Sequence, residues 1–483
     1  MTSPGAPAAV TGLAIVGGGP AGMAAARLAV DHGADVTVID EQPRVGGQIL
    51  RQPPRGVEVT DWLPGAVYRN VRRTLAEIEN DPSVDWRLRS SAVALLPQGN
   101  GHGVELWLDT PEGLQAVHAQ TVLLAPGCHE QPLHFPGWTL PGVMGAGALQ
   151  SFVKSQQLVP GRRFVLSGSH PLQLVVAEQL LRAGAEIAAV AFTQRPWAGL
   201  RLLATPMVAL RAHRQLSAAA AAMWHLRAAG VPVLFGHSVV RARGEESVSA
   251  AVVAPVDADG HPDLRRAREF ECDRIGVCHG FRVSSELARQ AGARVAWSTR
   301  RGGWLVAHDA WYRSSVDRLH VAGEITGMAG ADAALEEGRI AALGALRQIG
   351  AIDAAGAEAL AGPVRRRLAR LHRFADVLTR LSAPPGNLAA HLADDETLLC
   401  RCENVSVASF DRAVDDNAFI VTADAAKLLT RAGMGLCQGR LCGEQVARRL
   451  ERRRGLATGA AGALHVNLPV RPVRLGAAVG DED

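Results

Sequence analysis

The sequence contains 483 residues, of which 48% are hydrophobic and 20% charged, a balance typical of globular proteins with more than one core. The formal net charge is only +4 and basic residues are interspersed with acidic ones, so nucleic acid is not an expected partner. The N-terminus lacks the basic start of a secretory signal, and no stretch of about 18 residues is apolar enough for a transmembrane helix. We expect a cytoplasmic protein, in which seven cysteines favour metal or redox chemistry over disulfide bonds.

The first motif lies in residues 12–48, where an apolar strand, a glycine loop, a helix and a second apolar strand follow one another. The loop reads Gly17-x-Gly19-x-x-Gly22. In such a loop the first glycine permits a tight turn, the second lets the backbone approach a pyrophosphate, and the third lets the helix pack on the strand. The pattern therefore predicts a dinucleotide-binding unit.

The elements after the glycine loop complete this prediction. A helix beginning at Pro20 and Ala21 would point its free N–H groups and positive dipole end at the phosphates. The second strand ends in Asp40 and Glu41, and Asp40 lies 18 residues beyond Gly22. A carboxylate at this place can accept hydrogen bonds from the ribose hydroxyls, so Asp40 is the expected ribose ligand.

The loop RVGGQ at residues 44–48 supplies two more glycines, and with it the stretch resembles flavoproteins related to glutathione reductase, which have two dinucleotide-binding domains. Three later segments are similar to the strands and turns that contact FAD in that family: SSAVALL, TVLLAPG and SSVDRLHVAGE. The resemblance implies an α/β fold with FAD in the first unit. It implies that the cofactor contacts include Gly47, Gln48, Val93, Gly127, Gly323 and Glu324.

Residues 161–190 again follow the order strand, loop, helix, strand, which predicts a second dinucleotide-binding unit. Its loop reads Gly168-Ser-His170-Pro-Leu-Gln173, with two of the three glycines replaced. The His170 side chain would occupy the place where a pyrophosphate must approach the backbone. We therefore expect a retained scaffold that does not use NAD(P)H. Neither unit carries the close cysteine pair that a disulfide reductase of this class needs.

Four of the cysteines lie in one 43-residue window, as Cys400-x-Cys402 and Cys437-x4-Cys442. The segments around them have the periodicity of three short helices. Four thiolates can bind zinc or a [2Fe–2S] cluster, and the spacing alone leaves both open. Glycine- and glutamine-rich loops favour the cluster, as do four nearby cations that would offset its negative charge. These cations are Arg401, Lys427, Arg431 and Arg440.

The segments CRCE and TRAGMGLCQGRLC closely resemble the bacterioferritin-associated-ferredoxin-type [2Fe–2S] domain. The resemblance implies a small helical C-terminal domain in which the four cysteines hold a [2Fe–2S] cluster. A flavin and an iron–sulfur centre on one chain indicate an electron-transfer protein. The run RRLERRR at residues 448–454 is expected to be a solvated helix face.

The predicted organisation places the second unit inside the first, and the linker SAPPGN marks a boundary before the cysteine domain. The expected parts are an FAD-binding domain at 1–155 and 275–350, a degenerate second domain at 156–274, a helical linker at 351–395, a [2Fe–2S] domain at 396–455 and an extended tail at 456–483.

Over nearly the whole chain this order resembles the group that comprises the hydrogen cyanide synthase B subunit, the opine oxidase A subunit and the D-hydroxyproline dehydrogenase alpha subunit. In that group a separate amine-oxidase-like FAD subunit oxidises an amine or amino acid, and a subunit of this type receives the electrons. A small ferredoxin-like subunit is often present, and an FMN can lie between the two large subunits. The resemblance implies the same partners and cofactors here, and peripheral membrane association only through such a complex.

No residue of this chain can be assigned to the oxidation of a CH–NH or CH–NH2 donor, so we expect activity only in a complex. Two other functions stay open. One is a self-sufficient NAD(P)H-dependent flavin and [2Fe–2S] reductase. The other is an iron-handling or structural partner whose dinucleotide sites are empty.

Overall fold

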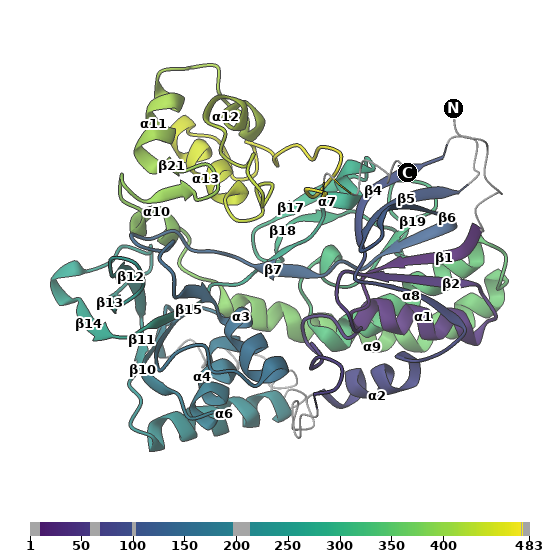
Figure 1. Ribbon diagram of the computed structural model, residues 1–483, viewed down its shortest axis with the longest axis horizontal. Helices are drawn as coiled ribbons and strands as arrows, with labels where there is room; N and C mark the ends of the chain where they lie inside the picture. Colours follow the sequence, from purple (N-terminus) through teal and green to yellow (C-terminus); the bar gives the residue numbers. More distant parts are fainter. Residues whose placement is uncertain (1–9, 58–67, 99–102, 197–212, 475, 477–483) are drawn as a thin grey trace.

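The computed structural model describes residues 10–57, 68–98, 103–196, 213–474 and 476 of the chain. It shows two α/β units next to each other and a small helical domain that contains the C-terminal cysteines (Figure 1). The predicted α/β flavoprotein-like fold with a helical C-terminal domain is confirmed.

The first unit is built on a seven-stranded sheet in the order β3-β2-β1-β6-β5-β4, with β19 also paired to β6. Its parallel core is buried. Every residue of β2 and six of the seven residues of β1 are buried, as expected where helices cover a sheet. The strands are β1 (Val10–Val16), β2 (Val36–Asp40), β3 (Val84–Leu88), β4 (Ser91–Pro97), β5 (Val104–Thr110), β6 (Gly113–Leu124) and β19 (Leu319–Val321).

Two helices, α1 (Pro20–Asp31) and α8 (Ala331–Gln348), pack side by side against this sheet (Figure 1). Small residues let them approach closely, since a Cβ added at Gly338 in α8 would lie 2.1 Å from the carbonyl oxygen of Ala21 in α1. The predicted helix after the glycine loop is thus confirmed. It begins at Pro20, whose missing N–H is harmless at a helix start. A shorter helix, α2 (Arg69–Ile78), adds its apolar side to the same core.

The second unit contains a five-stranded parallel sheet in the order β11-β10-β9-β15-β8. The predicted order of strand, loop, helix and strand appears as β9, α4 and β10. The sheet also takes β8 and all of β15, so it extends past the predicted limits of 156 and 274, because both segments pair in parallel beside β9. The elements are β8 (Val143–Gly145), α3 (Ala146–Ser151), β9 (Arg163–Gly168), α4 (Leu172–Arg182), β10 (Glu186–Phe192), α6 (His213–Ala228), β11 (Val233–Phe235) and β15 (Arg274–Cys278).

Short elements connect and extend the two units. A three-stranded antiparallel sheet covers the second unit, and the pair β7–β16 lies between the two units. These elements are β7 (Cys128–Glu130), the π-helix η3 (Phe152–Gln156), β12 (His237–Arg243), β13 (Ala250–Pro255), η5 (Leu264–Arg266), β14 (Arg268–Glu271), β16 (Phe281–Val283), α7 (Glu286–Gln290), β17 (Val295–Ser298), β18 (Gly303–Val306) and η6 (Gly323–Thr326).

The linker between the first unit and the cysteine domain is one long helix, α9 (Ala354–Ser382), which runs along α8. Asp353 caps its start by accepting a hydrogen bond from the Gly356 amide at 2.7 Å. His372 anchors the helix to α8 through Glu337, at 2.7 Å. The helix ends before the Pro-Pro-Gly sequence, and the short α10 (Leu388–Leu392) follows.

The cysteine domain consists of β20 (Leu398–Cys400), β21 (Val405–Ser406), α11 (Val407–Asp415), α12 (Ala423–Thr430) and α13 (Gly443–Arg454). The three predicted helices are therefore present. Ser406 and Thr422 cap α11 and α12 by accepting hydrogen bonds from Ser409 and Ala425, at 3.1 and 3.2 Å. Phe410 of α11 and Leu450 of α13 are fully buried in the core of the domain.

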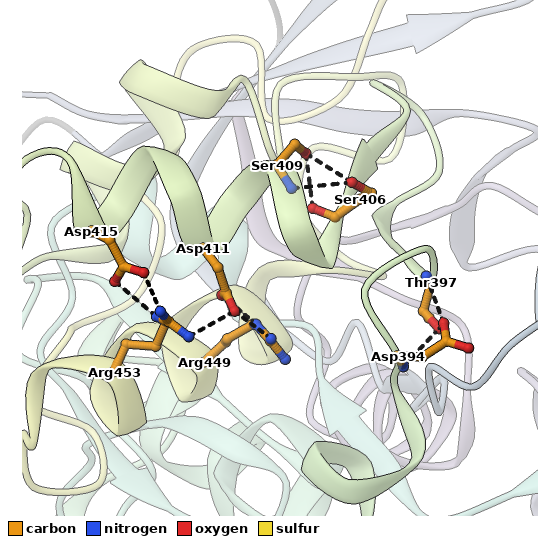
Figure 2. Close-up of polar contacts among 8 residues, drawn as sticks. All are labelled: Asp394, Thr397, Ser406, Ser409, Asp411, Asp415, Arg449 and Arg453. Carbon is orange, nitrogen blue, oxygen red and sulfur yellow. Dashed lines mark hydrogen bonds and ion pairs between the residues drawn. The ribbon is translucent and has the colours of Figure 1, made fainter.

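The arginine run at residues 448–454 is a solvated helix face only in part, because Arg452 and Arg453 are exposed and the other three arginines are partly buried. Arg449 donates two hydrogen bonds to the carboxylate of Asp411, each at 2.5 Å, and Arg453 pairs with both Asp411 and Asp415 (Figure 2). Arg454 donates to backbone carbonyls after α11. The run therefore holds α13 against α11, because its arginines meet carboxylates and free carbonyls of the facing helix.

Within the described ranges, no helix is both long enough and apolar enough to cross a lipid bilayer.

Candidate functional site

A large pocket of about 980 Å³ lies between the first unit, the end of α9 and the cysteine domain. It opens at the carboxyl ends of the parallel strands, where α/β sheets place their ligands. All of the predicted cofactor-contacting residues except Gly22 and Val93 line it.

The glycine loop has no room for a side chain at Gly17 or Gly22. Gly17 has a φ of 106°, and a Cβ there would lie 2.2 Å from the carbonyl oxygen of Ala125. A Cβ at Gly22 would lie 1.9 Å from the carbonyl oxygen of Gly17, so Gly22 lets the helix pack on the loop. Gly47 lies across Gly19, since its Cβ would be 2.8 Å from the Gly19 Cα. A bare backbone cradle of this kind is what the approach of a pyrophosphate requires.

The two acids at the end of β2 have different surroundings. Asp40 is 8% exposed, and its carboxylate accepts hydrogen bonds from the amides of Gly18 at 2.6 Å and Gln42 at 2.7 Å. Burial raises its pKa, although these two bonds oppose the rise. Glu41 instead lies at the rim of the pocket, where it pairs with Arg471 of the C-terminal tail. Asp40 thus braces the glycine loop, and Glu41 is the acid with its carboxylate at the surface.

Other predicted contacts surround the same pocket. The carbonyl groups of Gln48 and Ile49 accept hydrogen bonds from the buried Lys154, at 3.2 and 2.9 Å. Burial lowers the pKa of Lys154 to about 8. Gly127 turns the chain after β6 with a φ of 73°. Val93 lies behind the pocket wall, and its carbonyl accepts a hydrogen bond from the amide of Val470 at 2.8 Å.

The return segment brings Glu324 to the pocket wall, and the buried Glu337 lies behind it. The Gly323 amide donates to Glu337 at 2.9 Å. The Glu324 carboxylate accepts from the amides of Ala329 and Gly330, at 3.2 and 3.1 Å, immediately before α8. Burial, and then the nearby charge of Glu337, raise the pKa of Glu324 to about 7. A carboxylate therefore already meets the N–H groups at the start of α8.

The loop of the second unit is filled by its own residues. Nδ1 of His170 accepts a hydrogen bond from the Leu172 amide at 3.2 Å, and its ring lies edge-on to Phe281 at 5.1 Å. Burial lowers the pKa of His170 to about 4, so the ring is neutral at pH 7. A Cβ at Gly168 would lie 2.0 Å from the carbonyl oxygen of Cys278. The imidazole of His170 thus packs within its own loop, where the sequence predicted it to lie.

The four C-terminal cysteines come together although 34 residues separate the two pairs. The thiol of Cys442 forms hydrogen bonds with the sulfur atoms of Cys400 and Cys437, and these bonds are the main reason that the pKa of Cys400 falls to about 6 and that of Cys437 to about 5. Cys437 also contacts Cys402. Cys400 and Cys442 are buried, whereas Cys402 is exposed. In the described part of the chain, no three His, Cys, Asp or Glu side chains are arranged around a single metal ion.

The four predicted cations surround these cysteines unequally. Lys427 is 7% exposed and donates to the carbonyl of His465 at 3.4 Å. Arg440 lies in the cysteine loop itself, where it donates to the carbonyl of Cys437 at 3.4 Å. The remaining contacts are those of Arg431 with Glu403 at 2.8 Å and of Arg401 with the ring of Trp138 at 5.8 Å.

The pocket and the cysteine loop share a wall. His129, on β7, lines the pocket and donates from Nε2 to the carbonyl of Arg440 at 3.2 Å. Arg440 lies between Cys437 and Cys442 and lines the pocket as well. Burial lowers the pKa of His129, which keeps the ring neutral. Glu444, at the start of α13, pairs with Arg282 of β16. This ion pair connects the cysteine domain to the β7–β16 strand pair.

The sequence of the first two-thirds of the chain matches the pyridine nucleotide-disulphide oxidoreductase family over residues 11–338. The chain belongs to this family. The match covers the first unit and the second unit inserted into it, and it ends in α8, before the cysteine domain.

Two relatives match over nearly their whole length. Hydrogen cyanide synthase subunit HcnB of Pseudomonas aeruginosa is 36% identical over 469 residues, which are 95% of this chain and 96% of that protein. The A subunit of opine oxidase from Rhizobium meliloti is 32% identical over 480 residues, 96% of this chain and 97% of that protein. The solved structure of L-proline dehydrogenase from P. horikoshii superposes with a TM-score of 0.72 at 20% identity, over 98% of this chain and 80% of that one.

His129 and the tail residue Arg471 line the pocket but were not among the predicted contacts. For His129 the signal was its place directly after the turn at Gly127 in a family in which that turn meets the cofactor. For Arg471 the sequence contains no such signal, because its partner Glu41 is 430 residues away.

Proposed function

We propose that this chain is the electron-transfer subunit of a multisubunit amine or amino-acid oxidase or dehydrogenase. FAD would occupy the first pocket, and a [2Fe–2S] cluster would lie on Cys400, Cys402, Cys437 and Cys442. The relatives named above are themselves called subunits of hydrogen cyanide synthase and of opine oxidase.

The first pocket fits a flavin dinucleotide in shape and donor set. Its volume of about 980 Å³ is at the upper end for cofactor sites, and the bare glycine floor suits a pyrophosphate. Glu41 is the acid we assign to the ribose, in place of Asp40, because the Asp40 carboxylate already accepts two backbone hydrogen bonds. Gly323 and Gly127 leave space beside the expected ribityl chain.

The cysteine site fits a two-iron cluster better than a single zinc ion. The four thiols lie in two loops, as the closely spaced pairs Cys400–Cys402 and Cys437–Cys442. In a [2Fe–2S] cluster each iron takes two thiolates, so two pairs suffice. The contacts among the thiols lower the pKa of Cys400 and Cys437 and raise that of Cys442, so the four sulfur atoms lie close enough to share a ligand.

One observation carries the proposal: the same pocket is lined by the glycine loop and by Arg440 of the cysteine loop. A flavin supplies two-electron chemistry and an iron–sulfur centre supplies one-electron transfer. The residues of this chain bring the two sites together, and His129 holds the cysteine loop at the pocket wall.

The partners follow from the relatives, which are named as subunits of hydrogen cyanide synthase and opine oxidase. We propose that an amine-oxidase-like FAD subunit binds and deprotonates the amine, that an FMN lies at the interface with it, and that a small ferredoxin-like subunit completes the complex. The alternative of a self-sufficient NAD(P)H-dependent reductase is disfavoured by His170, which fills the loop where a second pyrophosphate would bind.

The experiment is anaerobic purification of the full chain, followed by analysis of flavin, iron and acid-labile sulfide. We expect one FAD and two irons with two sulfides per chain, and an electron paramagnetic resonance signal of a reduced [2Fe–2S] cluster after dithionite. Purified chain without releasable flavin, or with zinc in place of iron and sulfide, would contradict the proposal.

Two further measurements separate the alternatives. Addition of NADH or NADPH without oxygen should leave the flavin absorbance unchanged, whereas rapid bleaching would favour the self-sufficient reductase. Amine-dependent dye reduction should require co-expression with the amine-oxidase-like partner, and activity of the isolated chain would exclude the assigned division of labour.

A further inference from the structure

The C-terminal tail runs from the cysteine domain to the far edge of the first sheet, seen as the yellow trace that approaches β4 and β5 in Figure 1. We propose that residues 464–474, here called the strap, complete the adenosine end of the first pocket, so that an adenine nucleotide leaves only when the strap detaches. The inference rests on the proposed dinucleotide site but not on the cysteine cluster or on amine oxidation.

The strap is attached to the sheet beside the pocket. The Val470 amide donates to the carbonyl of Val93 in β4 at 2.8 Å. The Val470 side chain is 4% exposed and packs in the core formed by Val16, Ile39 and Leu95. Such burial of an apolar side chain contributes about 1.5 to 3 kcal/mol, which makes this contact a stable anchor.

Charged contacts continue the attachment on both sides of the pocket mouth. Arg471 pairs with Glu41, and both side chains line the pocket. Arg474 donates to the carbonyl of Thr110 and to the carboxylate of Asp109 in β5, the latter at 3.2 Å. Because Glu41 directly follows β2 and is the acid proposed for the ribose, the strap crosses the place where an adenosine would lie.

The other end of the strap is bound to the cysteine loop. Leu464 packs on backbone without side chains, since a Cβ at Gly433 or Gly439 would lie 2.6 or 2.5 Å from its Cδ1. The Leu464 carbonyl also accepts a hydrogen bond from Arg289. Arg440, between two of the cysteines, donates to the carbonyl of Val470 at 3.5 Å. The strap therefore contacts both sites, and nucleotide occupancy and the seating of the cysteine loop should depend on each other.

The chemistry selects the class of ligand. Glu41 accepts hydrogen bonds, which suits a ribose with free 2′ and 3′ hydroxyls, and Arg471 pairs with its carboxylate. A phosphate on the 2′ hydroxyl would meet the Glu41 carboxylate and be repelled. The expected occupant is an adenine nucleotide without a 2′-phosphate, of which FAD and ADP are the probes used below.

The test compares the full-length chain with Arg471→Gln and with a chain ending after Pro469. Release of bound FAD is followed by the recovery of flavin fluorescence on dilution. We expect release to be about tenfold faster from both variants. Arg265→Gln is the matched control, because the Arg265 side chain is 95% exposed on η5, and it should release FAD at the wild-type rate.

Hydrogen exchange of the strap gives a second readout. Peptides covering residues 464–474 should exchange more slowly with saturating FAD or ADP than without nucleotide, because the Val470 amide is then trapped. Equilibrium dialysis establishes binding first. If FAD or ADP binds but the exchange of the strap is unchanged, and all variants release FAD at the same rate, the strap proposal alone is overturned. Failure to bind either probe would overturn both the strap and the proposed dinucleotide site.

Discussion

Nε2 of His129 lies 3.2 Å from the carbonyl oxygen of Arg440, which joins β7 of the first unit to the loop between Cys437 and Cys442. The two residues are 311 positions apart in the sequence, and both line the large pocket. This hydrogen bond links the pocket directly to the cysteine site, so its removal tests whether the two sites work together.

Replacing His129 with Leu should slow electron transfer from flavin to cluster while flavin and iron contents stay unchanged. The variant loses one buried hydrogen bond, a change of about 1 kcal/mol in the docking of the cysteine loop. The rate of cluster reduction after flash photoreduction of the flavin measures the effect. His129→Gln, which can still donate, should lie closer to wild type. Equal rates in all three proteins would show that the contact is only structural.

Replacing Cys442 with Ser should remove most of the iron and acid-labile sulfide, because Cys442 contacts two of the other three sulfur atoms. Cys272→Ser is the matched control, since Cys272 is equally buried but lies in the second unit. It should keep the full cluster content. Iron and sulfide analysis of both variants gives the answer, and a complete cluster in Cys442→Ser would refute the ligand assignment.

Replacing Gly17 with Ala should abolish FAD binding and lower stability. The new Cβ would lie 2.2 Å from the Ala125 carbonyl oxygen, at a φ that costs about 1 to 3 kcal/mol for a residue other than glycine. Gly362→Ala, within α9 and with no atom closer than 3.8 Å to its Cβ, should instead stabilise the protein slightly. Thermal unfolding and flavin content distinguish the two, and normal flavin in Gly17→Ala would be unexpected.

Replacing Asp411 with Asn should destabilise the cysteine domain by about 1 to 3 kcal/mol, since Arg449 and Arg453 both lose a half-buried charged partner. Asp415→Asn serves as the control, because Asp415 is 48% exposed and its pair with Arg453 is largely screened. Hydrogen exchange in α11 and α13 measures the difference. Identical exchange in the two variants would contradict a role for Asp411 as the central carboxylate.

Acid should destabilise the fold through His279. This residue is 4% exposed, neither ring nitrogen has a hydrogen-bond partner, and burial lowers its pKa to about 4. The unfolded chain binds a proton near pH 6.5 and the folded chain does not. Stability is therefore complete above pH 6.5 and falls as the pH drops towards 4, by about 2 kcal/mol at pH 5.

Urea midpoints between pH 7 and pH 4.5 for wild type and His279→Leu test this. The urea midpoint of His279→Leu should depend less on pH, because leucine cannot bind a proton when the chain unfolds. Parallel curves would assign the acid sensitivity to other groups.

The local pattern of the first unit could be predicted because strand, glycine loop and helix are encoded by neighbouring residues. The choice between Asp40 and Glu41 could not, since it depends on which carboxylate the Gly18 amide reaches in the folded chain. The contacts of the arginine run at residues 448–454 could not be predicted for a similar reason. The sequence shows which residues are charged, but not that Asp411 faces the run in the folded chain. For distant residues the four cysteines are the exception, because their two closely spaced pairs predicted a shared site and the structure brings their sulfur atoms together.

The pairing of β19 with β6 has a consequence for biosynthesis. Leu319 lies beside Val122, and the 197 positions between them include the whole second unit. During translation, the inserted second unit can therefore fold before β19 is synthesised and can pair with β6. The pocket wall that contains Gly323 is synthesised late, so the pocket is complete only near the end of translation or afterwards.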